Sequence, residues 1–389
     1  MKPTFFAGNR ITLLETGTDY FPALIAAIDE ARTEVHLESY MYADDATGRA
    51  ITAALGRAAA RGVGVHVLVD GFGAPDFLSA LGYTLIAGGV QVMVYRPEVA
   101  RLRLRRHRLR RMHRKLAVVD GRIAFIGGIN IIDDIDAPAQ TSPRFDYAVA
   151  VEGPLLEPIH RSIHHLWKLV RWANFRRRLP DLVAAPPAPK PLGAINAAFI
   201  VRDNLRHRRD IEEAYLDAIA AARTEIIIAN AYFLPGRRFR HALTEAAARG
   251  VRVVVLLQGR IEYVLQHYAT QALYGSLIAG GVNIFEYLPG YLHAKVAVID
   301  GHWATIGSSN IDPFSLLLAR EANVIVRDAD FAGRLHASLT HAITQASCEI
   351  RVDDLRKRSW VNRTACWLAY TAMRLAVGIA GSYGREYRD

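Results

Sequence analysis

The chain has 389 residues, of which 51% are hydrophobic and 22% are charged. This apolar content excludes wholesale disorder and supplies a core for two ordinary domains or one large pseudo-dimer. The formal net charge of +10 favours anionic partners such as nucleic acid, acidic lipid surfaces or phosphorylated substrates. The chain has two cysteines, Cys348 and Cys366, which argues against a disulfide framework and against a cysteine-based zinc site.

Each half of the chain predicts alternating strands and helices. In the first half, residues 35–42 predict a strand, the alanine-rich run before Gly62 predicts a helix, and residues 66–70 predict a buried strand. The second half repeats this order, with strands at 226–233 and 253–258 around an alanine-rich run that ends before Gly250. The pattern is that of an α/β fold, present twice.

The repetition extends to the sequence itself. Matching stretches pair residues 31–42 with 222–233, 58–71 with 246–259, and 86–97 with 278–289. Between its arginine-proline pair and its motif the first half has 15 residues, 98–112, where the second half has three, 290–292. The first half therefore carries a densely basic insertion.

These features divide the chain into four predicted parts. We expect a first half at 1–184 with the basic insertion at 98–112, and a proline-rich linker at 185–193. A second half at 194–350 and a basic, aromatic tail at 351–389 complete the predicted organisation.

One nineteen-residue phrase occurs in both halves, MHRKLAVVDGRIAFIGGIN at 112–130 and LHAKVAVIDGHWATIGSSN at 292–310. Its Asp-Gly pair, between two short apolar runs, predicts a β-hairpin with a tight turn. Its histidine and lysine are two residues apart, so on one strand they share a face. The small residues before its asparagine allow a backbone or a ligand to approach closely.

Two such copies, related by a pseudo-twofold axis, would bring their polar side chains together between the halves. His113 and His293 would then supply a nucleophile and a general acid. Fixed lysines would neutralise a phosphoryl group, so we expect no metal and no cofactor. The predicted pocket for a tetrahedral anion consists of Lys115, Lys295, Asn130, Asn310, Gly128 and Ser308.

Four carboxylates accompany the motifs. Asp120 and Asp300 complete the motif and are candidate catalytic residues, but at a hairpin turn they could instead orient the turn or pair locally. Asp146 and Glu321 each begin a strand-like run after a motif, and they are better candidates to hydrogen-bond the far nitrogens of the histidines. A carboxylate there would fix the tautomer and stabilise the imidazolium.

The duplicated His-x-Lys-(x4)-Asp pattern, with Gly and Asn at fixed offsets, resembles the phospholipase D superfamily. The resemblance covers residues 8–350 and is closer still to the short bacterial cardiolipin synthases of the B type, carried by residues 8–17, 110–130 and 146–154. It implies an α/β fold of two homologous phospholipase D-like halves, paired about a pseudo-twofold axis with the active site at their interface. The catalytic residues that it implies are His113, Lys115, Asp120, His293, Lys295 and Asp300.

The implied reaction is transphosphatidylation through a phosphohistidine, with His113 as the nucleophile and His293 as the acid and base. One phosphatidylglycerol would give a phosphatidyl-histidine and glycerol, and a second would resolve it to cardiolipin. Phosphatidylethanolamine and a free alcohol are alternative acceptors. The main rivals are a hydrolytic phospholipase and a nuclease. A nucleic acid partner is disfavoured because small nucleases of this superfamily tend to carry one motif per chain.

The expected partner is an anionic phospholipid membrane, bound peripherally and, by default, on the cytoplasmic face, since residues 1–21 contain no signal-like apolar run. Three segments are candidates to reach the bilayer: the insertion residues 101–112, residues 159–179, and the tail from Arg356. In the tail, two arginines interrupt the apolar run at 360–381, which favours an interfacial helix over a span.

Each of these segments has a simpler explanation. The insertion could be a solvated charged surface, and the helices at 159–179 and in the tail could pack on the protein's own core. His160, His164 and His165 have a spacing that a metal could use. The sequence indicates no carboxylate or cysteine as their partner, so we expect no zinc site there. The sequence does not indicate an oligomeric state.

Overall fold

The protein is described by a computed structural model that covers residues 2–97, 110–134, 142–174, 190–203 and 206–380. Its described strands form one mixed sheet with the order β15-β11-β10-β9-β12-β13-β14-β8-β1-β7-β6-β5-β2-β3-β4. The strands are β1 (Phe6–Glu15), β2 (Glu34–Ser39), β3 (Gly64–Asp70), β4 (Gln91–Tyr95), β5 (Lys115–Val119), β6 (Ile123–Gly127), β7 (Tyr147–Glu152), β8 (Ile195–Arg202), β9 (Glu225–Asn230), β10 (Arg252–Gln258), β11 (Val282–Tyr287), β12 (Lys295–Ile299), β13 (Trp303–Gly307), β14 (Glu321–Arg327) and β15 (Ser347–Ile350).

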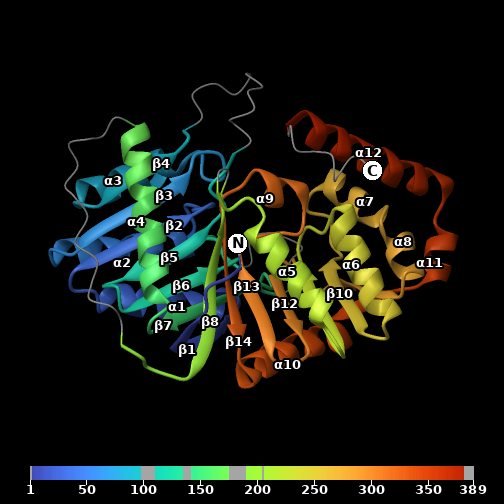
Figure 1. The fold of residues 1–389 in the computed structure, drawn as a ribbon. Coiled ribbons are helices and arrows are strands. Elements are labelled where there is room, and N and C mark those ends of the chain that lie inside the picture. The colour runs from blue at the N-terminus through green and yellow to red at the C-terminus, as the bar shows by residue number, and fades with distance from the viewer. Residues whose placement is uncertain (1, 98–109, 135–141, 175–189, 204–205, 381–389) are drawn as a thin grey trace.

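Helices cover both faces of this sheet (Figure 1). They are α1 (Thr16–Asp29), α2 (Ala46–Ala60), the π-helical turn η1 (Leu78–Gly82), α3 (Tyr83–Ala87), α4 (Leu156–Ala173), α5 (Asp210–Ala221), α6 (Arg237–Ala248), α7 (Val264–Gln271), α8 (Tyr274–Ala279), α9 (Pro313–Leu317), α10 (Ala329–Ala346), α11 (Val352–Lys357) and α12 (Trp360–Ala380). Helices α4 and α10 share one core that draws residues from both halves, whereas α1 and α2 on one side and α5 and α6 on the other each pack in the core of their own half.

The sheet order is nearly palindromic, and this confirms the predicted pseudo-twofold α/β fold. In the first half, β4-β3-β2-β5-β6-β7-β1 lie side by side, and β11-β10-β9-β12-β13-β14-β8 repeat that order in the second. The halves meet where β1 pairs antiparallel with β8, so that the two lie beside each other in one continuous sheet (Figure 1). The four predicted domain limits stay a prediction, and most of the linker, 185–189, lies outside the described residues.

The local chemistry of the chain accounts for these elements. The predicted hairpins are confirmed: β5 pairs with β6 and β12 with β13, and both turn residues of each, Asp120-Gly121 and Asp300-Gly301, have positive φ angles. Helix α2 ends one residue before Arg61-Gly62, and Gly62 has a φ of +85°. A left-handed residue after a helix favours glycine because it has no side chain to clash.

The two amphipathic helices predicted to reach a membrane differ in how they pack. In α4, Trp167 is buried in the protein core while Trp172 is 65% exposed, so the alternative of simple packing holds for Trp167. In α12, Cys366 and Met373 are buried, but Trp360 and Trp367 are exposed. None of the helices within the described residues is long and apolar enough to cross a bilayer. Residues 98–109 of the basic insertion lie outside the described part of the chain.

Asn9 joins the two halves at the β1–β8 junction. Its fully buried side chain donates to the carbonyl groups of Phe6 (2.6 Å) and Ile195 (3.2 Å) and accepts from the N–H of Leu155 (2.8 Å). One amide therefore satisfies backbone groups on both sides of the seam. Burying those groups without a partner is costly.

We expect Asn9→Ala to lower the free energy of unfolding by roughly 2–4 kcal/mol, because three buried backbone groups lose their partner. Urea denaturation would measure the change. The matched control is Asn283→Ala, since Asn283 lies on exposed β11 surface and makes one bond to Val253 O (3.0 Å). Equal losses in the two variants would contradict a bracing role for Asn9.

Candidate active site

The two motif histidines lie just before β5 and β12, and each is tied to the opposite half of the chain. The backbone N–H of His113 donates to Arg320 O at 2.9 Å, and that of His293 donates to Phe145 O at 2.8 Å. These partners immediately precede Glu321 and Asp146 in the sequence. The backbone of each half thus places its histidine against the carboxylate of the other.

The side chains of the histidines also pair with residues of the opposite half. His113 Nδ1 lies 3.1 Å from Glu321 Oε2, and His293 Nδ1 lies 2.6 Å from Asp146 Oδ2. Each Nδ1–H can donate to its carboxylate, which directs the basic Nε2 away from that contact. Both pairs join a motif histidine of one half to a carboxylate of the other, so this geometry needs both copies of the motif.

The motif lysines are buried beside the histidines. Lys115 Nζ donates to His113 O at 2.9 Å, and Lys295 Nζ donates to His293 O and lies 3.5 Å from Asp146 Oδ2. Burial lowers the pKa of Lys115 to about 7 and that of Lys295 to about 8. Both shifts are what desolvation does to an ammonium group. An anion placed between these lysines would favour their charged forms.

Burial also decides the charge of the other groups. It lowers the pKa of His113, and together with the charge of Lys295 it lowers the pKa of His293 well below its ordinary value. Burial raises the pKa of Asp146 to about 6. The resting histidines are therefore neutral near pH 7, which is the form that a nucleophile needs.

Both histidines open onto one cavity of about 550 Å³. Its walls include Arg111 of the basic insertion. They also include an arginine, two carboxylates and several aromatic rings that sequence reasoning missed, namely Arg144, Glu262, Asp312, Phe72, Tyr40, Tyr232 and Tyr263. The ring of Tyr40 lies edge-on to His113 at 4.7 Å, and that of Tyr232 lies edge-on to His293 at 6.4 Å. Tyr40 and Tyr232 belong to the repeated stretches 31–42 and 222–233, so the repeat could have indicated them as site residues.

Two further missed residues hold the backbone ahead of each histidine. Asp70 Oδ2 accepts from the N–H of Met112 at 2.8 Å, and Gln258 Oε1 accepts from the N–H of Leu292 at 2.8 Å. They end the equivalent strands β3 and β10, in the repeated stretches 58–71 and 246–259. Each therefore positions its histidine through the preceding peptide unit.

The two motif asparagines lie where the predicted anion pocket requires them. Asn130 and Asn310 are buried and both line the cavity with the histidines. Asn130 Oδ1 accepts from Met41 N–H at 3.2 Å, so its NH₂ group is the end of this amide that can donate to a phosphate. Their role as phosphate ligands stays a prediction.

The phosphate-binding role of Gly128 and Ser308 stays a prediction, and the hydrogen bonds of both residues point to a different role. Ser308 Oγ donates to Glu321 Oε2 at 2.6 Å, and the N–H groups of Ser308 and Gly128 donate to backbone carbonyls. A Cβ on Gly128 would lie 2.3 Å from a carboxylate oxygen of Asp146. Both residues instead make room for, or hold, the carboxylate that faces a histidine.

The catalytic role of Asp120 and Asp300 stays a prediction, and their contacts favour the alternative role at the hairpin turn. Asp120 accepts from the N–H groups of Arg32, Thr33 and Glu34 and from the hydroxyl of Thr33, at 2.8 to 3.2 Å. Asp300 bonds the equivalent segment in the second half, Arg223 to Glu225. Both lie at the far end of their strand from the histidine, which matches the alternative that they orient the hairpin.

Comparison with known proteins assigns the family. A family model described as cardiolipin synthase, PLD-like domain, matches residues 24–142 and 215–343, one match in each half. The cardiolipin synthase B of Escherichia coli strain K12 is 42% identical over 383 residues, which cover 98% of this chain and 92% of that protein. The chain belongs to the cardiolipin synthase family. The predicted resemblance to the phospholipase D superfamily is thereby confirmed.

More distant proteins share the cardiolipin synthase architecture. Cardiolipin synthase A of Pseudomonas putida is 33% identical over 352 residues, covering 90% of this chain and 71% of that protein. The crystal structure of phosphatidylserine synthase from Haemophilus influenzae Rd KW20 superposes with a TM-score of 0.70 at 13% identity, covering 97% of this chain and 96% of that one. That likeness shows a common fold.

The lysine pKa values predict an alkaline limit to activity. A lysine with a lowered pKa is charged below that value and neutral above it, so kcat/KM should fall as the pH rises through about 7 to 8. Initial rates from about pH 6 to about pH 10 would give this profile for the free enzyme. Lys168→Met, on the exposed face of α4, should leave the profile unchanged. A rate independent of pH across this window would contradict the need for both ammonium groups.

The two roles open to Asp120 are distinguished by separating stability from turnover. Asp120→Asn should lower the free energy of unfolding by about 1–3 kcal/mol, because the carboxylate accepts several backbone N–H groups. The kcat of the folded variant should stay within about threefold of wild type, whereas Asp146→Asn should cut kcat by at least about tenfold without lowering stability. Denaturation curves and initial rates on both variants would decide, and a large loss of kcat in folded Asp120→Asn would contradict the turn role and support the catalytic one.

Proposed function

We propose that this chain is a cardiolipin synthase that transfers a phosphatidyl group from one phosphatidylglycerol to a hydroxyl of a second, giving cardiolipin and glycerol. The crossed pairing of His113 with Glu321 and of His293 with Asp146 carries the proposal. It offers two imidazoles in one cavity, each backed by a carboxylate, with an ammonium group beside each. A phosphodiester between them would meet a nucleophile, an acid and fixed positive charge at once.

In the first step, neutral His113 attacks the phosphorus of phosphatidylglycerol through Nε2. A P–N bond forms, the P–O bond to the glycerol headgroup breaks, and protonated His293 delivers its Nε2 proton to the departing glycerol oxygen. The anionic substrate favours that protonated form, because a nearby negative charge raises the pKa of an imidazole. Lys115 and Lys295 stabilise the phosphoryl oxygens.

In the second step, the now neutral His293 takes the proton from a hydroxyl of the second phosphatidylglycerol. The hydroxyl oxygen bonds to phosphorus, the P–N bond breaks, and His113 leaves as a neutral imidazole. One phosphodiester is consumed and one is made, so the reaction needs no activated donor. Both histidines return to their starting protonation states.

Two observations support this order of roles. The side chain of His113 is 14% exposed and that of His293 8% exposed, so the proposed nucleophile is the more open to the cavity. The 2.6 Å contact between His293 Nδ1 and Asp146 is short, which suits a histidine that becomes an imidazolium during each step. Asp146 and Glu321 act in this scheme as positioning residues.

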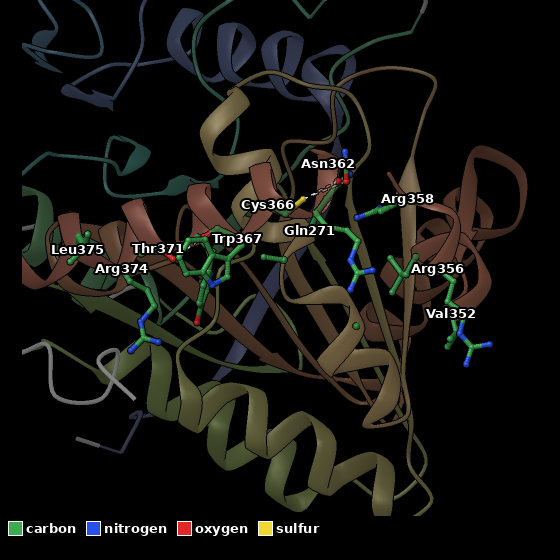
Figure 2. A pocket seen from close by; sticks show the side chains of 15 residues that line it. Gln271, Val352, Arg356, Arg358, Asn362, Cys366, Trp367, Thr371, Arg374 and Leu375 are labelled. Carbon is green, nitrogen blue, oxygen red and sulfur yellow. Dashed lines mark hydrogen bonds between the residues drawn. The ribbon is translucent and has the colours of Figure 1, made fainter. Parts of the chain in front are cut away.

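We also propose that α12 attaches the enzyme to the membrane surface. Its exposed face carries Trp360, Trp367 and Leu375, while Met373 on its buried face lines the active-site cavity. A groove of about 1010 Å³ runs between α12 and the segments α7, α8 and α11, and Figure 2 shows the arginines and the tryptophan along it. Its basic residues are Arg356, Arg358, Arg363 and Arg374.

This mixture of indole rings and arginines fits an anionic phospholipid surface. Tryptophan prefers the boundary between lipid headgroups and acyl chains, and each basic residue near such a surface contributes about 1 kcal/mol. Because α12 contacts both that surface and the cavity, a bound membrane would lie close to the proposed site of chemistry. The predicted cytoplasmic face stays a prediction.

The function is tested with vesicles that contain phosphatidylglycerol. Wild-type protein should form cardiolipin and an equal amount of free glycerol, measured by mass spectrometry of the lipids and an enzymatic glycerol assay. His113→Ala and His293→Ala should each lose at least about 10³-fold in rate, as expected when a nucleophile or its acid is removed. His341→Ala, on the exposed side of α10, is the matched control.

Other products would point to other functions. Phosphatidic acid without cardiolipin would identify a hydrolase that uses water as the acceptor. Cardiolipin formed at normal rates by either histidine variant would overturn the shared active site. Plasmid cleavage by wild type alone, without lipid turnover, would move the function to nucleic acid.

Attachment through α12 is tested by vesicle sedimentation. The double variant Trp360→Ser and Trp367→Ser should bind anionic vesicles at least about tenfold more weakly, since each large apolar side chain contributes roughly 1.5 kcal/mol or more on burial. Trp172→Ser is the control, because Trp172 on α4 is 65% exposed, between Trp367 at 62% and Trp360 at 77%. If Trp172→Ser weakened binding as much, the assignment of the membrane contact to α12 would be wrong.

A further inference from the structure

A second cluster of titratable side chains lies between α4 and the sheet of the first half, away from the active site. It contains Glu34 and His36 from β2 and His160 and His164 from α4. Glu34 sits at the end of β2 next to the β5–β6 turn, where its carbonyl oxygen accepts from Asp120 N–H. His113 precedes the opposite end of β5, so the reaction described above does not use this cluster.

The cluster corrects one prediction from the sequence. No carboxylate was expected near the histidines at 160 and 164, but Glu34, 126 residues before His160, lies against both. The two histidines stand one helical turn apart, so they share a face of α4. His165 is exposed on another face and takes no part.

Three imidazole nitrogens converge on the one carboxylate. His160 Nε2 lies 2.5 Å from Glu34 Oε1, whereas His36 Nε2 lies 3.0 Å and His164 Nε2 lies 3.6 Å from Glu34 Oε2. Glu34, His36 and His160 are buried. His164 Nε2 is itself buried and has no hydrogen-bond partner among the described residues, although it points at the carboxylate.

These separations suit a shared ion. Ligands held about 2.0–2.1 Å from a tetrahedral zinc ion are roughly 3.3 Å from one another. The ligand atoms of Glu34, His160 and His164 all lie within 4.8 Å of one another, and the contacts at 2.5 and 3.6 Å bracket that tetrahedral edge. Small side-chain rotations would therefore open the space that an ion needs.

We propose that Glu34, His160 and His164 form a binding site for a divalent transition metal ion of the zinc type. Two imidazoles and one carboxylate are a donor set that such ions prefer. His36 Nε2, 3.0 Å from Glu34 Oε2, would hold the carboxylate from behind as a hydrogen-bond partner. Calcium and magnesium prefer oxygen ligands and are disfavoured by the same set.

The surroundings support a structural site rather than a second reaction centre. His36 stacks on His66 with 4.4 Å between ring centroids, and Trp167 lies edge-on to His66 at 4.9 Å. These rings pack against the donor set and limit their rotation. An ion here would link α4 to β2, and so fasten the helix that covers one face of the first half.

The test uses the full chain without a histidine tag. After treatment with a chelator, the protein is loaded with Zn²⁺ or Co²⁺ and passed through a desalting column, and the retained metal is measured by elemental analysis. We expect about one ion per chain, visible absorption of the Co²⁺ form as in four-coordinate sites, and a higher melting temperature in the loaded protein.

Single substitutions locate the ion. His164→Gln and Glu34→Gln should each weaken retention at least about tenfold, whereas His165→Gln should bind as wild type does. Since the wild-type protein alone reports stoichiometry and spectrum, a variant that fails to fold does not remove the test. No retained ion in wild type, or equal retention in His164→Gln and His165→Gln, would overturn the proposal. The cluster would then be held by hydrogen bonds alone.

Discussion

The structure depends on the pairing of each motif histidine with a carboxylate from the other half of the chain. Each histidine finds its carboxylate partner 147 or 208 residues away, across the seam, rather than within its own motif. Buried polar groups must be paired. Once the two pairs have formed, neither half can move without leaving a histidine and a carboxylate unpaired. The β1–β8 pairing and the backbone bonds of Arg320 and Phe145 hold the halves in the arrangement that these pairs require, and the cavity lies where the pairs meet.

The cost of burying so much charge explains the shape of the site. Two lysines, two histidines and two carboxylates share a small volume from which most solvent is removed. Opposite charges offset part of that cost. The part that is not offset shifts the pKa values of the lysines and of Asp146 toward their neutral forms. An anionic phosphodiester that binds beside the two lysines would raise their pKa values and favour their charged forms. Substrate and site would then stabilise each other.

Much of this could be predicted from the sequence, for a physical reason. The repeat, the Asp-Gly turns and the spacing of His and Lys are local patterns, and local patterns specify strands, hairpins and side-chain direction. Residues that act across long separations could not be predicted this way. The pairing of Glu34 with His160, the support from Asp70 and Gln258, and the use of Ser308 to hold Glu321 depend on the packed fold. The sequence therefore predicted a substrate role for the small residues Gly128 and Ser308, and could not predict their contacts with Asp146 and Glu321.

The junction at β1 and β8 has a consequence for how the two copies can change. In each half taken alone, that strand would be an unpaired sheet edge, open to pairing with another copy. A self-pairing dimer of one half would be symmetric, and every substitution would appear on both sides of its site. Fusion into a single chain removes that constraint, so Gly128-Ile129 and Ser308-Ser309 differ, and one half alone carries the basic insertion. Covalent joining would thus permit two equivalent histidines to take the unequal roles proposed above.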